Sequence, residues 1–133
     1  RLQGDWSSDV CSSDLRLAPG GVLVTQASTP FFAPKVMASI RRTLARVGLQ
    51  TRAYSVDVPS FGPWGFVLAH AAGDWRTPRP LPFRGRWIDD QQLQGLFHLA
   101  RDLQPPDGDP VLPNRLSRPV LMEYQRQGRW RDG

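Results

Sequence analysis

The order of secondary structure is set by a segment that reads VLVTQA over residues 22–27 and PKVMASIRRTLARVG over residues 34–48. The first run is short, apolar and rich in β-branched residues, which predicts a buried strand of a parallel sheet. In the second run apolar residues recur at helical spacing and basic residues fall on the opposite face. Pro34 suits the first turn of a helix and Gly48 suits the residue after its end, so we expect one amphipathic helix between them.

Two further strands are predicted after this helix. Residues 49–56 and residues 64–70 are apolar runs separated by a loop that contains Pro59, Gly62 and Pro63. So short a connection permits an antiparallel pair, whereas a parallel pair needs a longer crossover. The pattern therefore predicts an α/β unit of the form strand, helix, strand, strand, with the last strand antiparallel.

The second half of the chain carries weaker signals. Residues 71–88 are rich in Pro and Arg and predict an extended loop. Asp89 and Asp90 are interpreted as the cap of a short helix that follows them, in preference to a pair of catalytic carboxylates. Residues 104–114 predict another loop, and residues 119–124 predict a short helix.

The first fifteen residues carry no signal for a folded element. From Asp5 to Leu15 they read DWSSDVCSSDL, which is, position by position, the translation of a common DNA-sequencing adapter. We therefore expect residues 1–15 to be non-native and residues 16–133 to be the C-terminal fragment of a longer domain. The only cysteine, Cys11, lies in the first segment, so it supports neither a disulfide nor a metal site.

Composition and charge exclude several classes of protein. The chain has 133 residues, with 17 Lys and Arg against 12 Asp and Glu. Residues 16–133 hold sixteen of the basic and nine of the acidic residues, a net charge of +7. No run approaches the roughly 18–20 apolar residues of a membrane-spanning helix. The basic residues are scattered, so no nucleic-acid partner is expected. The alternative is a small basic module that binds nucleic acid or an anionic membrane surface, which the charge alone supports.

Four short motifs are more specific than these patterns. They read GVLVTQAS (21–28), PFF (30–32), VPSFG (58–62) and WGFVLA (64–69). These motifs resemble the spermidine synthases, which are polyamine aminopropyltransferases, and most of all a bacterial branch whose domain follows a multi-pass membrane segment. The motifs NRL (114–116) and PVLMEY (119–124) resemble the end of that branch. The resemblance covers roughly residues 17–125.

The resemblance implies the C-terminal part of a Rossmann-like fold of the S-adenosylmethionine methyltransferase type. It implies that the intact parent is an enzyme of polyamine biosynthesis, which moves an aminopropyl group to putrescine or a similar diamine. The co-substrate would be decarboxylated S-adenosylmethionine, with no metal and no other cofactor. The parent would be a homo-oligomer whose cytoplasmic domain is attached to membrane helices. The alternative enzyme is a methyltransferase or a synthase-like protein of the same fold.

The resemblance also identifies substrate-binding residues. Gln26 matches the glutamine that lines the family's diamine site, and an amide oxygen there can accept a hydrogen bond from an ammonium group. Ser60 and Phe61 match a Thr/Ser–Tyr pair. Phe61 keeps the aromatic wall but lacks the hydroxyl, which leaves the preferred amine open. The family's glycine-rich nucleotide loop and its catalytic Asp segment precede the residue-22 strand and are missing here, so we expect this chain alone to be inactive.

The remaining polar and aromatic residues support no site of their own. His70 and His98 lie far apart and lack neighbouring ligands at metal-binding spacing, so neither is expected to bind a metal. Trp64 is interpreted mainly as a core residue. The cluster of Arg84, Arg86 and Trp87 is interpreted as a solvated loop.

Overall fold

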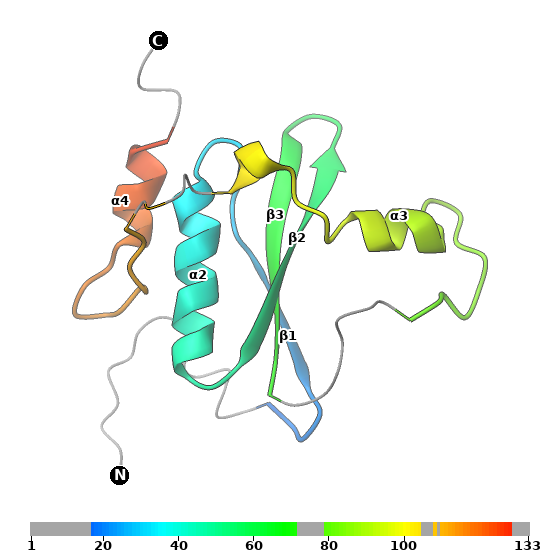
Figure 1. Cartoon of the computed structure of the whole chain (residues 1–133), viewed down its shortest axis with the longest axis horizontal. Coiled ribbons are helices and arrows are strands. Elements are labelled where there is room, and N and C mark those ends of the chain that lie inside the picture. Colours follow the sequence, from blue (N-terminus) through cyan, green and yellow to red (C-terminus); the bar gives the residue numbers. More distant parts are fainter. Residues whose placement is uncertain (1–16, 72–78, 105–107, 109, 129–133) are drawn as a thin grey trace.

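A strand, a helix and two strands make up the first half of the fold (Figure 1). β1 spans Val22–Gln26, α2 spans Pro34–Arg46, β2 spans Gln50–Val58 and β3 spans Gly62–His70. The predicted order of strand, helix, strand, strand is confirmed. This computed structural model describes residues 17–71, 79–104, 108 and 110–128, so the predicted non-native segment, 1–15, lies outside the described residues.

The three strands form one sheet in the order β1-β3-β2, and β3 pairs antiparallel with both neighbours. The prediction that the last strand is antiparallel is confirmed, and β1 and β2 consequently run in the same direction. The prediction that β1 is a buried strand of a parallel sheet is wrong for the described residues. β1 is an edge strand whose only pairing is antiparallel, and Val22 and Val24 are 52% and 49% exposed because nothing described covers that face.

The hydrophobic core lies between the sheet and α2. Apolar side chains of α2 recur at helical spacing and are buried, with Leu44 completely enclosed. They meet Ala53 of β2 and Val67 and Ala69 of β3, which alternate with side chains on the opposite face. Gly48 has a φ of +88°, which is the left-handed conformation expected of a glycine just after a helix.

The loop after β1 is fixed against the middle of the sheet by Gly65. Ala27 N–H donates to the Gly65 carbonyl, and Gly65 N–H donates to the Ser28 carbonyl, each at 2.8 Å. A Cβ on residue 65 would lie 3.1 Å from Cδ of Pro30 and 3.2 Å from Sδ of Met37. A side chain at residue 65 would therefore require the neighbouring atoms to shift by a few tenths of an ångström where this loop crosses β3. Ser28 itself adopts a φ of +61°, an uncommon conformation for a non-glycine residue.

Short helices complete the fold. α3 spans Asp90–Gly95, a 3₁₀ turn η1 spans Arg101–Leu103, and α4 spans Leu121–Arg126. The predicted cap of α3 is confirmed. The Asp89 carboxylate accepts the Gln92 backbone N–H at 2.7 Å, and the Gln92 side chain accepts the Asp89 N–H at 3.0 Å. The helix predicted within residues 119–124 is also confirmed as α4.

Two hydroxyl groups on α2 hold the C-terminal segment in place. Ser39 Oγ donates to the Leu112 carbonyl at 2.7 Å, and Thr43 Oγ1 accepts the Asn114 N–H at 2.8 Å. Thr43 also donates to the Ser39 carbonyl, so both of its hydrogen-bonding roles are used. α4 consequently lies on the far side of α2 from the sheet (Figure 1). Within the described ranges, no helix has the length and apolar character needed to span a membrane.

Candidate functional site

Gln26 is the last residue of β1 and its side chain is exposed. It lies opposite Phe66 on β3, and Phe66 lies opposite Tyr54 on β2. Because neighbouring strand residues point to opposite faces, and Val67 points toward α2, these three side chains share the face of the sheet that α2 does not cover. A glutamine, a phenylalanine and a tyrosine therefore form one row across all three strands.

Ser60 and Phe61 lie in the turn between β2 and β3, closed by a hydrogen bond from Phe61 N–H to the Val58 carbonyl. Both residues are exposed, and Phe61 retains 68% of its accessible surface. The Phe61 ring contacts Trp64 edge-on, with ring centroids 5.8 Å apart. Trp64 is half-buried beside the turn, so it is not the enclosed core residue that the sequence suggested.

The predicted residues lie toward the same end of the sheet but at different levels, because Gln26 is level with Tyr54, whereas Val58, which ends β2, is four residues further along. β1 and β2 run in the same direction, so Gln26 and the turn after β2 both follow the carboxyl ends of strands (Figure 1). Trp64 lies two residues from Phe66 and on the same face, opposite Val56 on β2 and in contact with the Phe61 ring. An amide oxygen can accept a hydrogen bond from an ammonium group, and aromatic faces attract cations. This arrangement is suited to a cationic amine.

The three strands place no carboxylate on this face of the sheet. The side chains that alternate with those facing α2 are the following: Val22, Val24 and Gln26 on β1; Gln50, Arg52, Tyr54, Val56 and Val58 on β2; Trp64, Phe66, Leu68 and His70 on β3. None of them is acidic. The described strands therefore bring no carboxylate base to this face, and its one imidazole, His70, lies level with Val22 at the opposite end of β1 from Gln26.

Sequence reasoning missed Tyr54, the third member of the row. Its ring stacks on Phe66 at 5.2 Å between centroids and meets Phe97 at 5.3 Å with a tilt of 49°. Desolvation by burial raises the pKa of the Tyr54 hydroxyl above its ordinary value. The strand register places the Tyr54 ring beside the Phe66 ring, and the segment after α3 adds the Phe97 ring. The local sequence shows only that Tyr54 and Phe66 alternate with the residues of their own strands that face α2.

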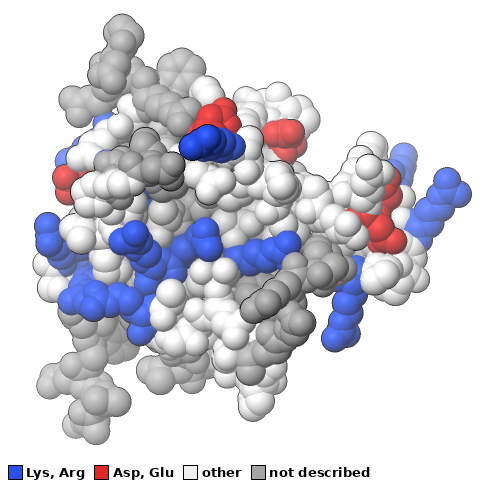
Figure 2. Space-filling model, in the orientation of Figure 1, with Lys and Arg blue, Asp and Glu red and all other residues white. Residues whose placement is uncertain are grey.

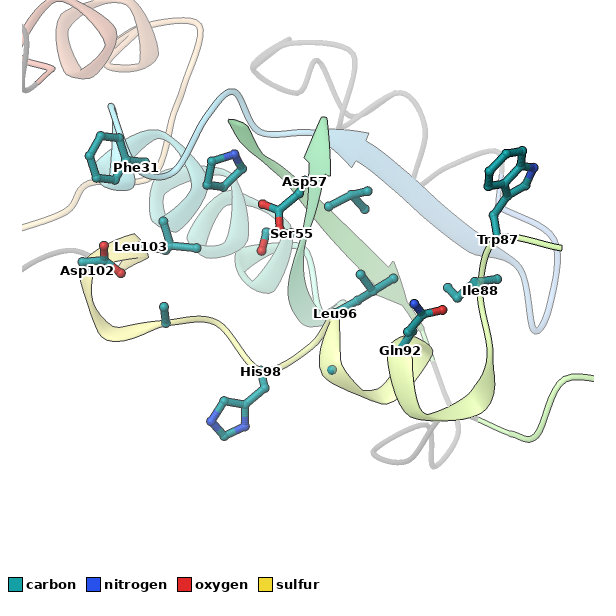
Figure 3. A pocket seen from close by; sticks show the side chains of 14 residues that line it. Phe31, Ser55, Asp57, Trp87, Ile88, Gln92, Leu96, His98, Asp102 and Leu103 are labelled. Atoms are coloured by element: carbon teal, nitrogen blue, oxygen red, sulfur yellow. The ribbon is translucent and has the colours of Figure 1, made fainter. Parts of the chain in front are cut away.

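An open cavity of about 800 Å³ lies between β2 and the segment around α3 (Figure 3). Ser55 N–H donates to the Leu96 carbonyl at 3.1 Å and so ties that segment to the outer edge of β2. Phe31 and Trp87 stand at opposite ends of the cavity, and Asp57 lies between them. Gln26, Ser60 and Phe61 are not among its lining residues, so this cavity is distinct from the predicted amine site.

The other polar residues have structural partners or lie apart. Of the two aspartates interpreted as a helix cap, Asp89 caps α3, whereas Asp90 Oδ1 accepts the Leu81 N–H at 2.7 Å and so holds the loop before the helix. In the part of the chain that the structure describes, no three His, Cys, Asp or Glu side chains come together as metal ligands. Trp87 is 83% exposed and carries the Arg86 guanidinium 5.1 Å from its ring centre.

Comparisons with known proteins place this geometry in a family context. No protein-family model matches the chain. The chain is 40% identical over 119 residues to polyamine aminopropyltransferase 1 of Streptomyces coelicolor, covering 87% of this chain and 22% of the relative. It is 37% identical over 109 residues to polyamine aminopropyltransferase 2 of Ralstonia nicotianae, covering 81% of this chain and 21% of the relative. The polyamine aminopropyltransferase of Mycobacterium tuberculosis is 35% identical over 115 residues. The chain thus spans about a fifth of the length of these relatives, and the predicted family resemblance is confirmed.

Proposed function

This chain belongs, as a segment, to the polyamine aminopropyltransferase family, and we propose that the protein it comes from transfers an aminopropyl group in polyamine biosynthesis. The donor would be decarboxylated S-adenosylmethionine and the acceptor putrescine or a similar diamine. The observation that carries the proposal is the homology over more than four fifths of the chain, joined to an amide and aromatic rings at one end of the sheet. No metal is required for a displacement at the carbon next to a sulfonium.

We propose that the three strands are the last part of a Rossmann-like sheet. Strands β1 and β2 share one direction, and β3 lies antiparallel between them. Among the described residues the second edge of β1 has no strand beside it, while Val22 and Val24 are half-exposed. Further parallel strands could pair at that edge and bring helices that cover the open face. This would make β1 the buried strand that its apolar sequence indicates.

We propose that Gln26, Ser60 and Phe61 contact the amine substrate. The Gln26 amide oxygen would accept a hydrogen bond from the distal ammonium group, and Phe61 with Trp64 would form an aromatic wall beside it. The attacking nitrogen must lose a proton and approach the carbon in line at about 3–3.5 Å. Since these strands bring no carboxylate to that face, the general base would come from elsewhere in the longer protein.

The experiment begins with the gene. The locus would be amplified from the source DNA and read upstream of the codon for Leu17, where we expect a glycine-rich loop and an Asp-containing segment in place of residues 1–15. The same reading would test our proposal that the domain is cytoplasmic and attached to membrane helices. If residues 1–15 return from clean DNA, the chain is not an interrupted aminopropyltransferase domain, and the function proposed for it is wrong.

The longer protein would then be assayed by mass spectrometry for aminopropyl transfer from decarboxylated S-adenosylmethionine to diamines of different length. We expect Gln26→Ala to raise KM for the amine about tenfold or more, because a hydrogen bond to a charged group contributes about 1.5–3 kcal/mol. Gln127→Ala, which changes an exposed glutamine just after α4, is the matched control and should leave KM unchanged. Methyl transfer from S-adenosylmethionine without aminopropyl transfer would favour the methyltransferase alternative.

We also propose that the 133-residue chain has no activity by itself. It offers an amide and aromatic groups for an amine but, on that face of its described strands, no carboxylate, and His70 lies at the opposite end of β1 from Gln26. Incubating the purified chain with putrescine and decarboxylated S-adenosylmethionine should give no spermidine. Measured turnover would show that the chain contains a base and a donor site that this reasoning omits.

A further inference from the structure

A small basic pocket opens at the outer edge of β2, between that strand, α2 and the segment after α3. It has a volume of about 370 Å³, and the polar or aromatic side chains that line it are Arg41, Arg52, Phe97, His98 and Gln104. No Asp or Glu lines it. Its two guanidinium groups carry positive charge and offer only donors, so they repel a cationic amine and the pocket is not a second amine site.

Aromatic stacking orients one of the two arginines. The Arg52 guanidinium carbon lies 4.1 Å from the centre of the Phe97 ring, and the Tyr54 ring meets the same phenylalanine at 5.3 Å. A guanidinium that stacks on a ring uses its flat face and keeps its N–H groups in the plane around the edge. It has five such donors, so Arg52 can serve an anion together with another acceptor. This stacking reduces the side-chain freedom that binding would otherwise have to remove.

The second arginine comes from a different element. Arg41 projects from the exposed side of α2, one residue from Ile40, which is buried in the core. The core therefore fixes the backbone that carries Arg41, while β2 carries Arg52 in the same pocket. Two guanidinium groups anchored on separate rigid elements can approach one oxyanion from two directions.

The pocket also lies at the end of a band of positive charge. Figure 2 shows Lys and Arg side chains gathered in a band across this side of the molecule, over α2 and the elements beside it. Arg42 and Arg46 are also exposed on α2, and the Arg42 guanidinium donates to the Val111 carbonyl. Arg115, next to Asn114, is exposed as well. Charges of one sign gathered on one side raise the local concentration of anions.

We propose that this pocket binds a phosphate group, with Arg41 and Arg52 as its main ligands and the Gln104 amide and His98 beside them. The phosphate could belong to a small soluble polyanion or to an anionic lipid headgroup, because both offer the same oxygens. Gln26, Ser60 and Phe61 do not line this pocket, although Arg52 lies only two residues before Tyr54, which is level with Gln26. The proposal therefore does not depend on the amine chemistry proposed above.

The test measures, by calorimetry at physiological salt, how the probe inorganic pyrophosphate binds to the 133-residue chain. We expect saturable binding that Arg41→Gln weakens about tenfold, the value of one charge-assisted hydrogen bond. Arg52→Lys keeps the charge but loses the planar fork, and it should weaken binding by a similar factor. Arg84→Gln removes the same charge in the loop before α3, outside this pocket, and is the matched control. Arg41 is exposed on a helix, so its replacement should leave the melting temperature unchanged.

Equal weakening by Arg84→Gln would show that binding is diffuse electrostatic attraction, and the proposal would be wrong. If pyrophosphate does not bind saturably, binding to vesicles that contain phosphatidylglycerol decides the proposal. The proposal then stands only if Arg41→Gln and Arg52→Lys reduce vesicle binding and Arg84→Gln does not. Vesicle binding with this pattern identifies a lipid headgroup as the source of the phosphate. Pyrophosphate binding with this pattern, and no vesicle binding, identifies a soluble polyanion.

Discussion

Asn114 closes the loop that leads into α4, and its replacement by alanine tests how the C-terminal segment is held. The side-chain Oδ1 accepts the Val120 N–H at 3.0 Å and the Leu121 N–H at 3.4 Å. Val120 is the residue before α4, and its own side chain makes no capping hydrogen bond. Asn114 therefore satisfies backbone donors at the start of α4 from six and seven residues away.

The expected cost follows from burial and distance. Asn114 is 8% exposed and Val120 is 3% exposed, so water cannot readily replace the lost acceptor at the Val120 N–H. Leaving a buried donor without a partner costs about 1–3 kcal/mol. The bond to Leu121 is longer than the usual 2.7–3.2 Å range and contributes less. We therefore expect Asn114→Ala to lower the free energy of unfolding by about 2–3 kcal/mol.

Urea denaturation of the full chain would measure this loss, and hydrogen exchange would locate it at the Val120 and Leu121 amides. Asn114→Asp keeps an oxygen acceptor in the same place and should retain more protection at both amides than alanine does. Gln127→Ala removes an exposed side-chain hydrogen bond and should cost less than about 0.5 kcal/mol. An alanine variant that costs no more than this control, with unchanged exchange, would refute the capping role assigned to Asn114.

Three further predictions address other parts of the fold. Gly65→Ala should lower the free energy of unfolding, measured by urea denaturation, by about 1–3 kcal/mol, because a Cβ would approach neighbouring atoms to 3.1 Å. Gly95→Ala is the control and should cause no such loss, because a Cβ there meets no atom within 4 Å. Asp89→Ala should cost about 1 kcal/mol and speed exchange of the Gln92 amide, while Asp89→Asn should preserve the cap. The raised pKa of Tyr54 means that the folded state holds its proton more tightly than the unfolded state. Its contribution to stability is thus complete below about pH 10 and is lost as pH rises through the folded-state pKa, and Tyr54→Phe should abolish that decline.

The elements that local signals define were predicted well. Pro34 begins α2, and Gly48 follows its end with a positive φ, because helix ends are encoded by residues within a few positions. The Asp89 cap is equally local. The exposure of β1 was not predictable in the same way. An apolar run shows that a strand is suited to burial, but whether it has a neighbour on both edges depends on residues far away in the sequence.

In the candidate site, too, some residues are identified from the local sequence, whereas others come together only through the fold. Gln26, Ser60 and Phe61 were identified through family motifs, and their contact with an amine stays a prediction. The row of Gln26, Phe66 and Tyr54 needs the register of three strands, which no single strand encodes. The contacts of Asn114 with α2 span 71 positions and have no local signature. Long-range placement, rather than residue type, is therefore what sequence reasoning missed.

The composition of β1 gives a physical argument for a wider sheet that does not depend on homology. Natural proteins protect an exposed edge strand with charged side chains, proline or a bulge, since an open edge pairs readily with other chains. β1 reads VLVTQ and contains none of the charges or prolines that serve this purpose. Its apolar, β-branched residues instead match a strand that has neighbours on both edges and cover on both faces. A strand with this composition is suited to the interior of a sheet, where further strands would pair with the open edge of β1 and helices packed on the sheet would cover Val22 and Val24.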